Sequence, residues 1–199
     1  MSEQLTTEVL ADSRGIGLIE LIVYSMLLVI ISVIAGSLLI TALTSQRDIT
    51  AMSSATSRGQ VLAASIENGV RTASTITVPA TSSIGQRLVT RTGRFTAAGV
   101  GTWLCRSWLI APTGKVYYRS STAAIPAPSS LSATDLAGWS LLTEGVKTAP
   151  GATSAFSLSG STLSVAVEVA GTHGAPALIK NRISKQTLPT TTGTGPSSC

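Results

Sequence analysis

Residues 21–46 form a run of 26 amino acids without a single Asp, Glu, Lys or Arg, and without proline. As an α-helix, a run of this length reaches about 39 Å at 1.5 Å per residue, which exceeds the ~30 Å hydrocarbon core of a bilayer. Four hydroxyl side chains in the run can donate to carbonyls one turn back and so tolerate lipid: Ser25, Ser32, Ser37 and Thr41. The run predicts one helix that spans a membrane.

A cleaved secretory signal is one alternative for this segment. The apolar region of such a signal has about 7–15 residues and follows a basic stretch. Here the run is longer, and residues 1–15 carry three acids (Glu3, Glu8 and Asp12) against one base, Arg14. We therefore favour a span that is retained.

A plain membrane anchor is a second alternative, and Glu20 argues against it. A carboxylate inside an otherwise apolar segment costs about 2.5–3.5 kcal/mol near mid-bilayer and less near the interface. It needs a cationic partner, but no base follows within a helical turn, and Arg14 lies six residues back on another face. We expect the partner of Glu20 on a second molecule.

The segment Arg14-Gly15-Ile16-Gly17-Leu18-Ile19-Glu20-Leu21-Ile22-Val23 resembles the prepilin cleavage motif of type IV pilins and type II secretion pseudopilins. In that family a peptidase cuts after the glycine and methylates the new N-terminus. The resemblance implies that residues 1–15 are a leader ending at Gly15, that Ile16 begins the mature chain, and that Glu20 is its fifth residue. The new α-amine, whose unperturbed pKa is about 7.7–8.0, would then pair with Glu20 of a neighbouring subunit.

Beyond the apolar run, the pattern predicts that the helix continues as an amphipathic segment over residues 47–74. Apolar or small residues recur there at helical spacing: Ile49, Met52, Thr56, Gly59, Leu62, Ala63, Ile66 and Val70. Ser, Gly and Thr residues from Gly69 onward favour an end of the helix near that point. A linker helix without an attached sheet is the alternative.

Residues 75–185 show the period-2 alternation and the turn signals of short strands. Strands are expected over 75–78, 87–91, 102–110, 115–121, 139–142, 155–158, 162–169 and 177–183. The fold class is therefore α+β and pilin-like: a long N-terminal helix, membrane-spanning in its first half (residues 16–46), packed on a small antiparallel β-sheet. Residues 186–199, rich in Thr, Gly, Pro and Ser, are expected to form a flexible tail.

The two cysteines, Cys105 in an expected strand and Cys199, allow one intramolecular disulfide if the domain is exported to an oxidising compartment. Closing that loop would stabilise the fold by about 4–5 kcal/mol in the chain-entropy model. Members of the resembled family often fasten a C-terminal segment in this way. A buried free Cys105 with an unpaired Cys199 is the alternative.

The remaining ionisable residues form no catalytic or metal-binding pattern. Only 12% of residues are charged, about half the usual share. Asp135, Glu144 and Glu168 are isolated along the chain, and no phosphate-binding glycine motif occurs. His173 lies in a Gly-Thr-His-Gly turn. We therefore predict a protein that is not an enzyme and uses no cofactor or metal ion.

Five arginines of the β-region are candidates for a basic patch beside Trp103, Trp108 and Tyr117: Arg87, Arg91, Arg94, Arg106 and Arg119. With the net charge of +5, such a patch would attract nucleic acid. The alternatives are a solvated face or a face that packs on acidic neighbours.

Together these features predict a structural subunit of a type IV pilus-like fibre or pseudopilus. Residues 141–146 and 180–182 are similar to the larger minor pseudopilins and favour a minor subunit. The expected partners are other pilin-like subunits, the prepilin peptidase and membrane lipid before assembly, with DNA as a further candidate. The expected location is the bacterial cytoplasmic membrane, single-pass with an exported C-terminal domain, and then an extracellular or periplasmic fibre. A membrane-anchored surface adhesin or DNA-binding module that forms no fibre is the alternative.

Overall fold

The computed structural model describes residues 17–95, 101–171, 175–185 and 199. The chain divides into two compact units, Met1–Arg47 and Asp48–Cys199, and each is described by itself. The expected leader, His173 and all but the last residue of the expected tail lie outside the described residues.

The helix α1 covers Leu18–Arg71 (54 residues) and so contributes to both units. It begins after Gly17, whose carbonyl accepts the amide hydrogens of Glu20 and Leu21, and it ends close to the point predicted from the glycine and threonine content. In the first unit every described side chain is exposed. The predicted hydroxyl contacts are confirmed, because four hydroxyls donate to carbonyls three or four residues back: Ser25, Ser32, Ser37 and Thr41.

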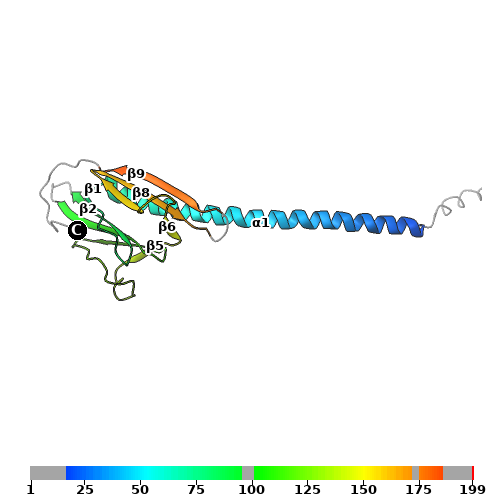
Figure 1. Ribbon diagram of the computed structural model, residues 1–199, viewed down its shortest axis with the longest axis horizontal. Coiled ribbons are helices and arrows are strands. Elements are labelled where there is room, and N and C mark those ends of the chain that lie inside the picture. Colours follow the sequence, from blue (N-terminus) through cyan, green and yellow to red (C-terminus); the bar gives the residue numbers. More distant parts are fainter. Residues whose placement is uncertain (1–16, 96–100, 172–174, 186–198) are drawn as a thin grey trace, which may run out of the picture. The chain divides into compact units, whose positions relative to one another are not determined.

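Five strands of the second unit form an antiparallel sheet in sequence order, labelled in part in Figure 1. Their bounds are β1 Ala73–Thr77, β2 Gln86–Phe95, β3 Gly101–Ile110, β4 Val116–Ser121 and β5 Ser140–Thr143. The predicted hairpin between β3 and β4 is confirmed, with Ile110 opposite Val116. Gly114 has φ of +79° in its turn, a conformation that residues with a Cβ adopt at a cost.

A second antiparallel sheet contains β6 Val146–Thr148, β7 Phe156–Ser159, β8 Thr162–Val169 and β9 Ala177–Ser184. β8 is central: β6 and β7 pair with different parts of it, and β9 pairs with it along its full length. The predicted alternation of β8 is confirmed, because Leu163, Val165, Val167 and Val169 are buried while the residues between them are half-buried.

The fold is α+β with antiparallel sheets, as predicted, but the expectation of one small sheet is wrong. The chain changes sheets between β5 and β6, at Glu144 and Gly145, where Gly145 has φ of +79°. The amide of Val146 donates to the carbonyl of Gly114, and β6 then pairs with β8 instead of β5. The side-chain amide of Gln86 bonds both backbone groups of Phe156 and so joins β2 to β7.

The core of the second unit lies between the C-terminal part of α1 and the two sheets (Figure 1). Two glycines let the helix approach closely. A Cβ at Gly69 would overlap the ring of Trp108 on β3, and a Cβ at Gly59 would overlap Ile179 on β9. The buried residues of α1 are Ala51, Ala55, Gly59, Leu62, Ile66, Gly69 and Val70.

The predicted buried face of α1 is wrong in its first two turns. Ile49 and Met52 are 67% and 53% exposed, and Thr56 is exposed too, while Ala51 and Ala55 are buried in their place. Ala51, Ala55 and Gly59 are spaced four residues apart, so they form one row along the helix. Small side chains allow a helix to lie close to its neighbours, whereas the sequence pattern had favoured the larger apolar residues of the adjacent row.

Candidate functional site

The first turn of α1 carries the lone carboxylate of the apolar segment. Glu20 is the third residue of the helix, and its carboxylate accepts a hydrogen bond from the hydroxyl of Tyr24 at 3.2 Å. An acidic group in the first turn also interacts favourably with the positive end of the helix dipole. Tyr24 is a partner that the sequence reasoning missed, although its position four residues after Glu20 could have indicated it.

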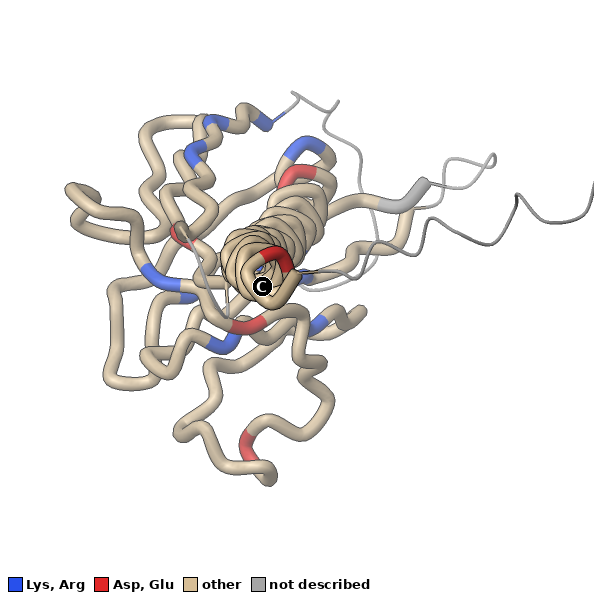
Figure 2. The backbone as a smooth tube through the Cα atoms, turned by 90° about the vertical axis from the view of Figure 1, so that its right-hand side faces the viewer, with Lys and Arg blue, Asp and Glu red and all other residues tan. Residues whose placement is uncertain are grey.

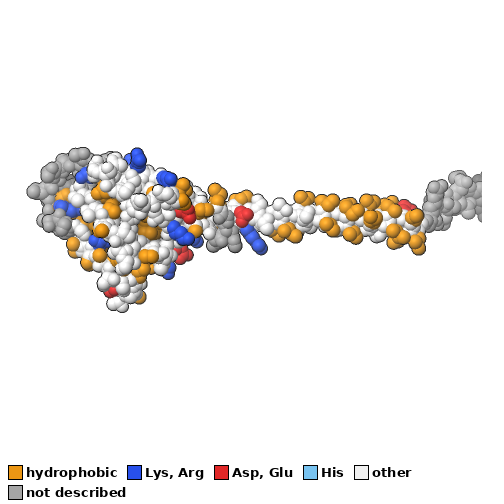
Figure 3. Space-filling model, in the orientation of Figure 1, with side chains coloured by type: hydrophobic (Ala, Val, Ile, Leu, Met, Phe, Trp, Pro, Cys, Tyr) orange, Lys and Arg blue, Asp and Glu red, His pale blue; other side chains and the backbone are white. Residues whose placement is uncertain are grey.

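Gly15 and Ile16, the residues of the predicted cleavage and methylation site, lie outside the described residues. Downstream of Glu20, hydrophobic side chains cover the helix of the first unit (Figure 3). By length and composition, α1 is able to cross a membrane.

The two cysteines form a disulfide between β3 and the last residue. Cys105 is fully buried and Cys199 is half-buried, and 94 positions separate them along the chain. The bond holds Cys199 against the face of the five-stranded sheet that is opposite α1, because Cys105 and Trp108 lie on different faces of β3.

The same face of the five-stranded sheet is covered further by the segment between β4 and β5. Arg87 donates from Nη1 to the carbonyl of Ile125 at 3.2 Å, and Arg119 donates from Nη1 to the carbonyl of Ala137 at 3.3 Å. Ile125 itself is only 1% exposed. Two of the predicted patch arginines therefore hydrogen-bond to carbonyls of this covering segment.

The five predicted patch arginines do not come together on one surface. Strand register puts Arg87, Arg91 and Arg119 on the face opposite α1, whereas Arg106 pairs with Thr90 on the other face. A β-strand turns successive side chains to opposite faces, so odd and even positions separate. The side chain of Arg94 lies outside the described part. Figure 2 shows Lys and Arg positions spread around the second unit instead of gathered along one side.

The tryptophans expected beside these arginines have different surroundings. Trp108 is fully buried, so its predicted place at a surface patch is wrong. Its indole N–H donates to the hydroxyl of Ser65 on α1 at 3.0 Å, and its ring lies 5.4 Å from that of Tyr118. Trp103 does meet an arginine: the guanidinium of Arg91 lies 3.8 Å from the centre of its ring, in cation–π geometry.

Among the described residues, no group of three or more His, Cys, Asp or Glu side chains is placed to hold a metal ion. One ion pair of the second unit joins Arg71 to Glu67, 2.6 Å apart at the end of α1. The chain matches no protein-family model, and no curated protein or solved structure matches it.

Proposed function

We propose that this protein is a structural subunit of a type IV pilus-like fibre or pseudopilus. In this proposal the chain is cleaved after Gly15, and its subunits assemble through the N-terminal helix. The supporting observation is that residues 18–46 of α1 are all exposed and carry a single charged side chain, the carboxylate of Glu20 in the first turn. A second support is the continuation of that helix onto antiparallel sheets, an architecture compatible with the resembled family.

Glu20 would set the register between neighbouring subunits. Cleavage after Gly15 creates a cationic amine at Ile16, four residues before the carboxylate. In an apolar fibre core a carboxylate and an amine each need an opposite charge, because an unpaired buried ion costs several kcal/mol. The hydroxyl of Tyr24 supplies one neutral hydrogen bond to Glu20, and that bond leaves the negative charge uncompensated. A neighbour's amine would complete the pair.

The direct test replaces the carboxylate and follows processing and assembly separately. Glu20→Ala and Glu20→Gln are expressed in the native host, and processed protein is measured in membranes and in sheared fibres. We expect normal cleavage and at least a tenfold loss of incorporation, since removing one partner of a buried ion pair costs about 3–5 kcal/mol. Glu67→Gln removes a carboxylate from the same helix where it pairs with Arg71, and it should leave incorporation unchanged.

Normal incorporation of both Glu20 variants would contradict the pairing role. A fibre-free protein that retains residues 1–15 would favour the alternative, a membrane-anchored surface module. The number of copies of this protein per fibre is measured in the same fractions. A minor subunit is present in few copies, whereas the main subunit accounts for most of the fibre mass, and we expect few copies.

A further inference from the structure

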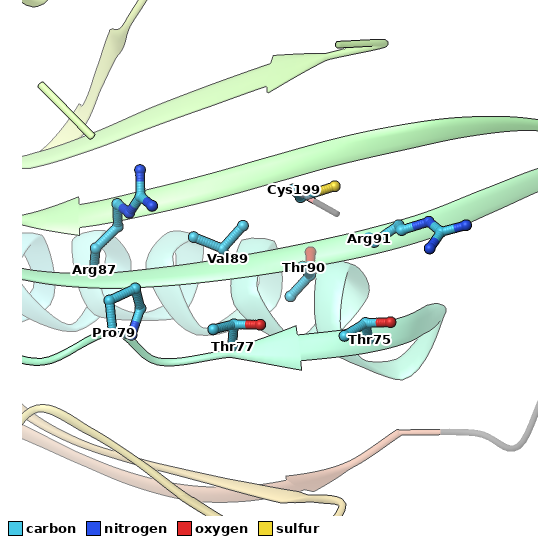
Figure 4. Close-up of a pocket in the computed structure, with 8 residues that line it drawn as sticks. All are labelled: Thr75, Thr77, Pro79, Arg87, Val89, Thr90, Arg91 and Cys199. Atoms are coloured by element: carbon cyan, nitrogen blue, oxygen red, sulfur yellow. The ribbon is translucent and has the colours of Figure 1, made fainter. Parts of the chain in front are cut away.

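The face of the five-stranded sheet opposite α1 has a hollow of about 220 Å³ between β1 and the C-terminal residue. Figure 4 shows its side chains: Thr75 and Thr77 on β1, Arg87 and Val89 on β2, with Cys199 beyond them. Pro79, just after β1, closes one side. The hollow is smaller than the ~300–1,000 Å³ pockets that hold drug-sized ligands, so it has room for about one small ring.

Arg87 is a cation in an unusual setting within this hollow. Its side chain is half-buried, and desolvation lowers the pKa of the guanidinium. A guanidinium has five N–H donors, yet within the described chain Arg87 makes a single hydrogen bond, from Nη1 to the neutral carbonyl of Ile125. No ion pair joins this guanidinium to another residue in the described part of the chain, and a partly desolvated cation of this kind favours an anionic ligand.

Arg91 lines the same hollow at its other end, four residues along β2. Its guanidinium is engaged over the ring of Trp103. Arg87 is therefore the cation that we assign to a ligand's negative charge.

The threonines of β1 add neutral hydrogen-bonding groups. Thr77 is directly opposite Val89 and Thr75 is directly opposite Arg91 in the antiparallel register, so their side chains stand on the same face as the two arginines. Both threonines are exposed, and neither hydroxyl bonds to another described residue. Their methyl groups and the half-buried ring of Pro79 supply apolar contact area beside the polar groups, over the buried side chain of Val89.

We propose that this hollow binds one acidic sugar residue, with the carboxylate on Arg87, ring hydroxyls on Thr75 and Thr77, and the C–H face against Pro79 and the threonine methyl groups. A sugar acid combines a single negative charge, several hydroxyls and an apolar ring face in one small molecule. The proposal goes beyond assembly: it assigns the second unit a ligand, and it holds whether or not the subunit enters a fibre.

Cys199 forms one wall of the hollow, and the disulfide to Cys105 holds it there. The shape of the proposed binding site therefore depends on a disulfide bond that a reductant can cleave. Reducing the disulfide should weaken ligand binding in the wild type, whereas binding to the Cys199→Ser variant should be weak already and insensitive to reductant.

The test uses the full chain in micelles of an uncharged polyoxyethylene detergent, because glycoside detergents would compete. Glucuronate and galacturonate are titrated by calorimetry, with glucose, galactose and inorganic phosphate as comparisons. A ligand of this size at ordinary ligand efficiency binds with a dissociation constant of about 1 mM. We expect at least tenfold weaker binding for Arg87→Gln and several-fold weaker binding for Thr77→Val, with no change for Arg182→Gln, an exposed arginine on β9.

Three results would overturn the assignment: equal affinity for glucose and glucuronate, equal affinity for phosphate and glucuronate, or unchanged affinity in Arg87→Gln. Thermal unfolding is recorded for each variant, and Thr77→Val, which keeps the side-chain shape, carries the test if Arg87→Gln fails to fold. Fibre incorporation of these variants is measured separately, so a failure of sugar binding is distinguishable from a failure of assembly.

Discussion

At the scale of single residues, Trp108 determines how α1 meets the five-stranded sheet. Its ring is fully buried, its N–H donates to Ser65, and its edge occupies the space that a side chain at Gly69 would need. Two residues one helical turn apart therefore accommodate the indole of Trp108. Ser65 accepts the hydrogen bond of its N–H, and Gly69 leaves space for its ring.

Gly69→Ala should destabilise the second unit despite the better helix propensity of alanine. The added Cβ would overlap the ring of Trp108, and overpacking of this kind costs about 1–3 kcal/mol, while alanine recovers only about 1 kcal/mol. Thermal unfolding of the full chain in micelles measures the difference. Gly36→Ala is the matched control, because no atom lies within 4 Å of its added Cβ; an equal effect of both changes would contradict the packing argument.

Ser65→Ala tests the polar half of the same contact. The variant leaves a buried indole N–H without its acceptor, which costs about 1–3 kcal/mol. Ser54→Ala, on an exposed position of α1, should leave the unfolding temperature unchanged. If both variants unfold at the wild-type temperature, the hydrogen bond contributes nothing measurable.

Asp135 offers a test by pH. Hydrogen bonds from the hydroxyls of Ser130 and then Ser129 stabilise its carboxylate and lower its pKa. Because the pKa is lowered in the folded state, the hydrogen bonds to ionised Asp135 stabilise the folded loop fully above the ordinary carboxyl pKa. This stabilisation is lost as the pH falls through the lowered pKa. Ser130→Ala should raise the pKa of Asp135, as measured by carboxyl NMR titration, and Ser120→Ala should not. An unchanged titration of Asp135 in Ser130→Ala would contradict this cause.

At the scale of elements, β8 and α1 show what a sequence pattern can and cannot predict. The alternation of β8 is read directly, because burial on one face repeats every second residue. β6 is missed, since three residues with one buried valine carry no period, and its pairing with β8 depends on contacts distant in sequence. Gly59 was predicted on the buried face, but Ala51 and Ala55 of the same row are missed, because close packing selects small residues where the hydrophobic pattern favours large ones.

The disulfide is the element-scale contact with the largest expected energy. Closing a loop across 94 positions stabilises the folded state by about 4–5 kcal/mol in the chain-entropy model. Cys199→Ser is the suitable variant, because it leaves the buried Cys105 in place as a small apolar side chain. Its unfolding temperature should fall and become insensitive to reductant, while that of the wild type falls only when reductant is added. Equal unfolding temperatures for the two proteins without reductant would contradict the prediction.

At the scale of the whole molecule, the sequence predicts the order of its parts better than their surfaces. The apolar run predicts the N-terminal part of α1, and the spacing of hydrophobic residues after it predicts an α+β fold with antiparallel strands. The predicted arginine patch fails, because its members were grouped by sequence neighbourhood while strand parity places Arg106 and Arg87 on opposite faces. The hollow beside Arg87 is formed by β1, β2 and Cys199, and no local sequence pattern could have brought these together.

In the proposed fibre, the single carboxylate of the apolar part of α1 is matched by an amine that only proteolysis creates. The most direct measurement is the intact mass and N-terminal sequence of the protein recovered from native fibres. We expect a chain that begins at Ile16. Fibres built from chains that still begin at Met1 would contradict it.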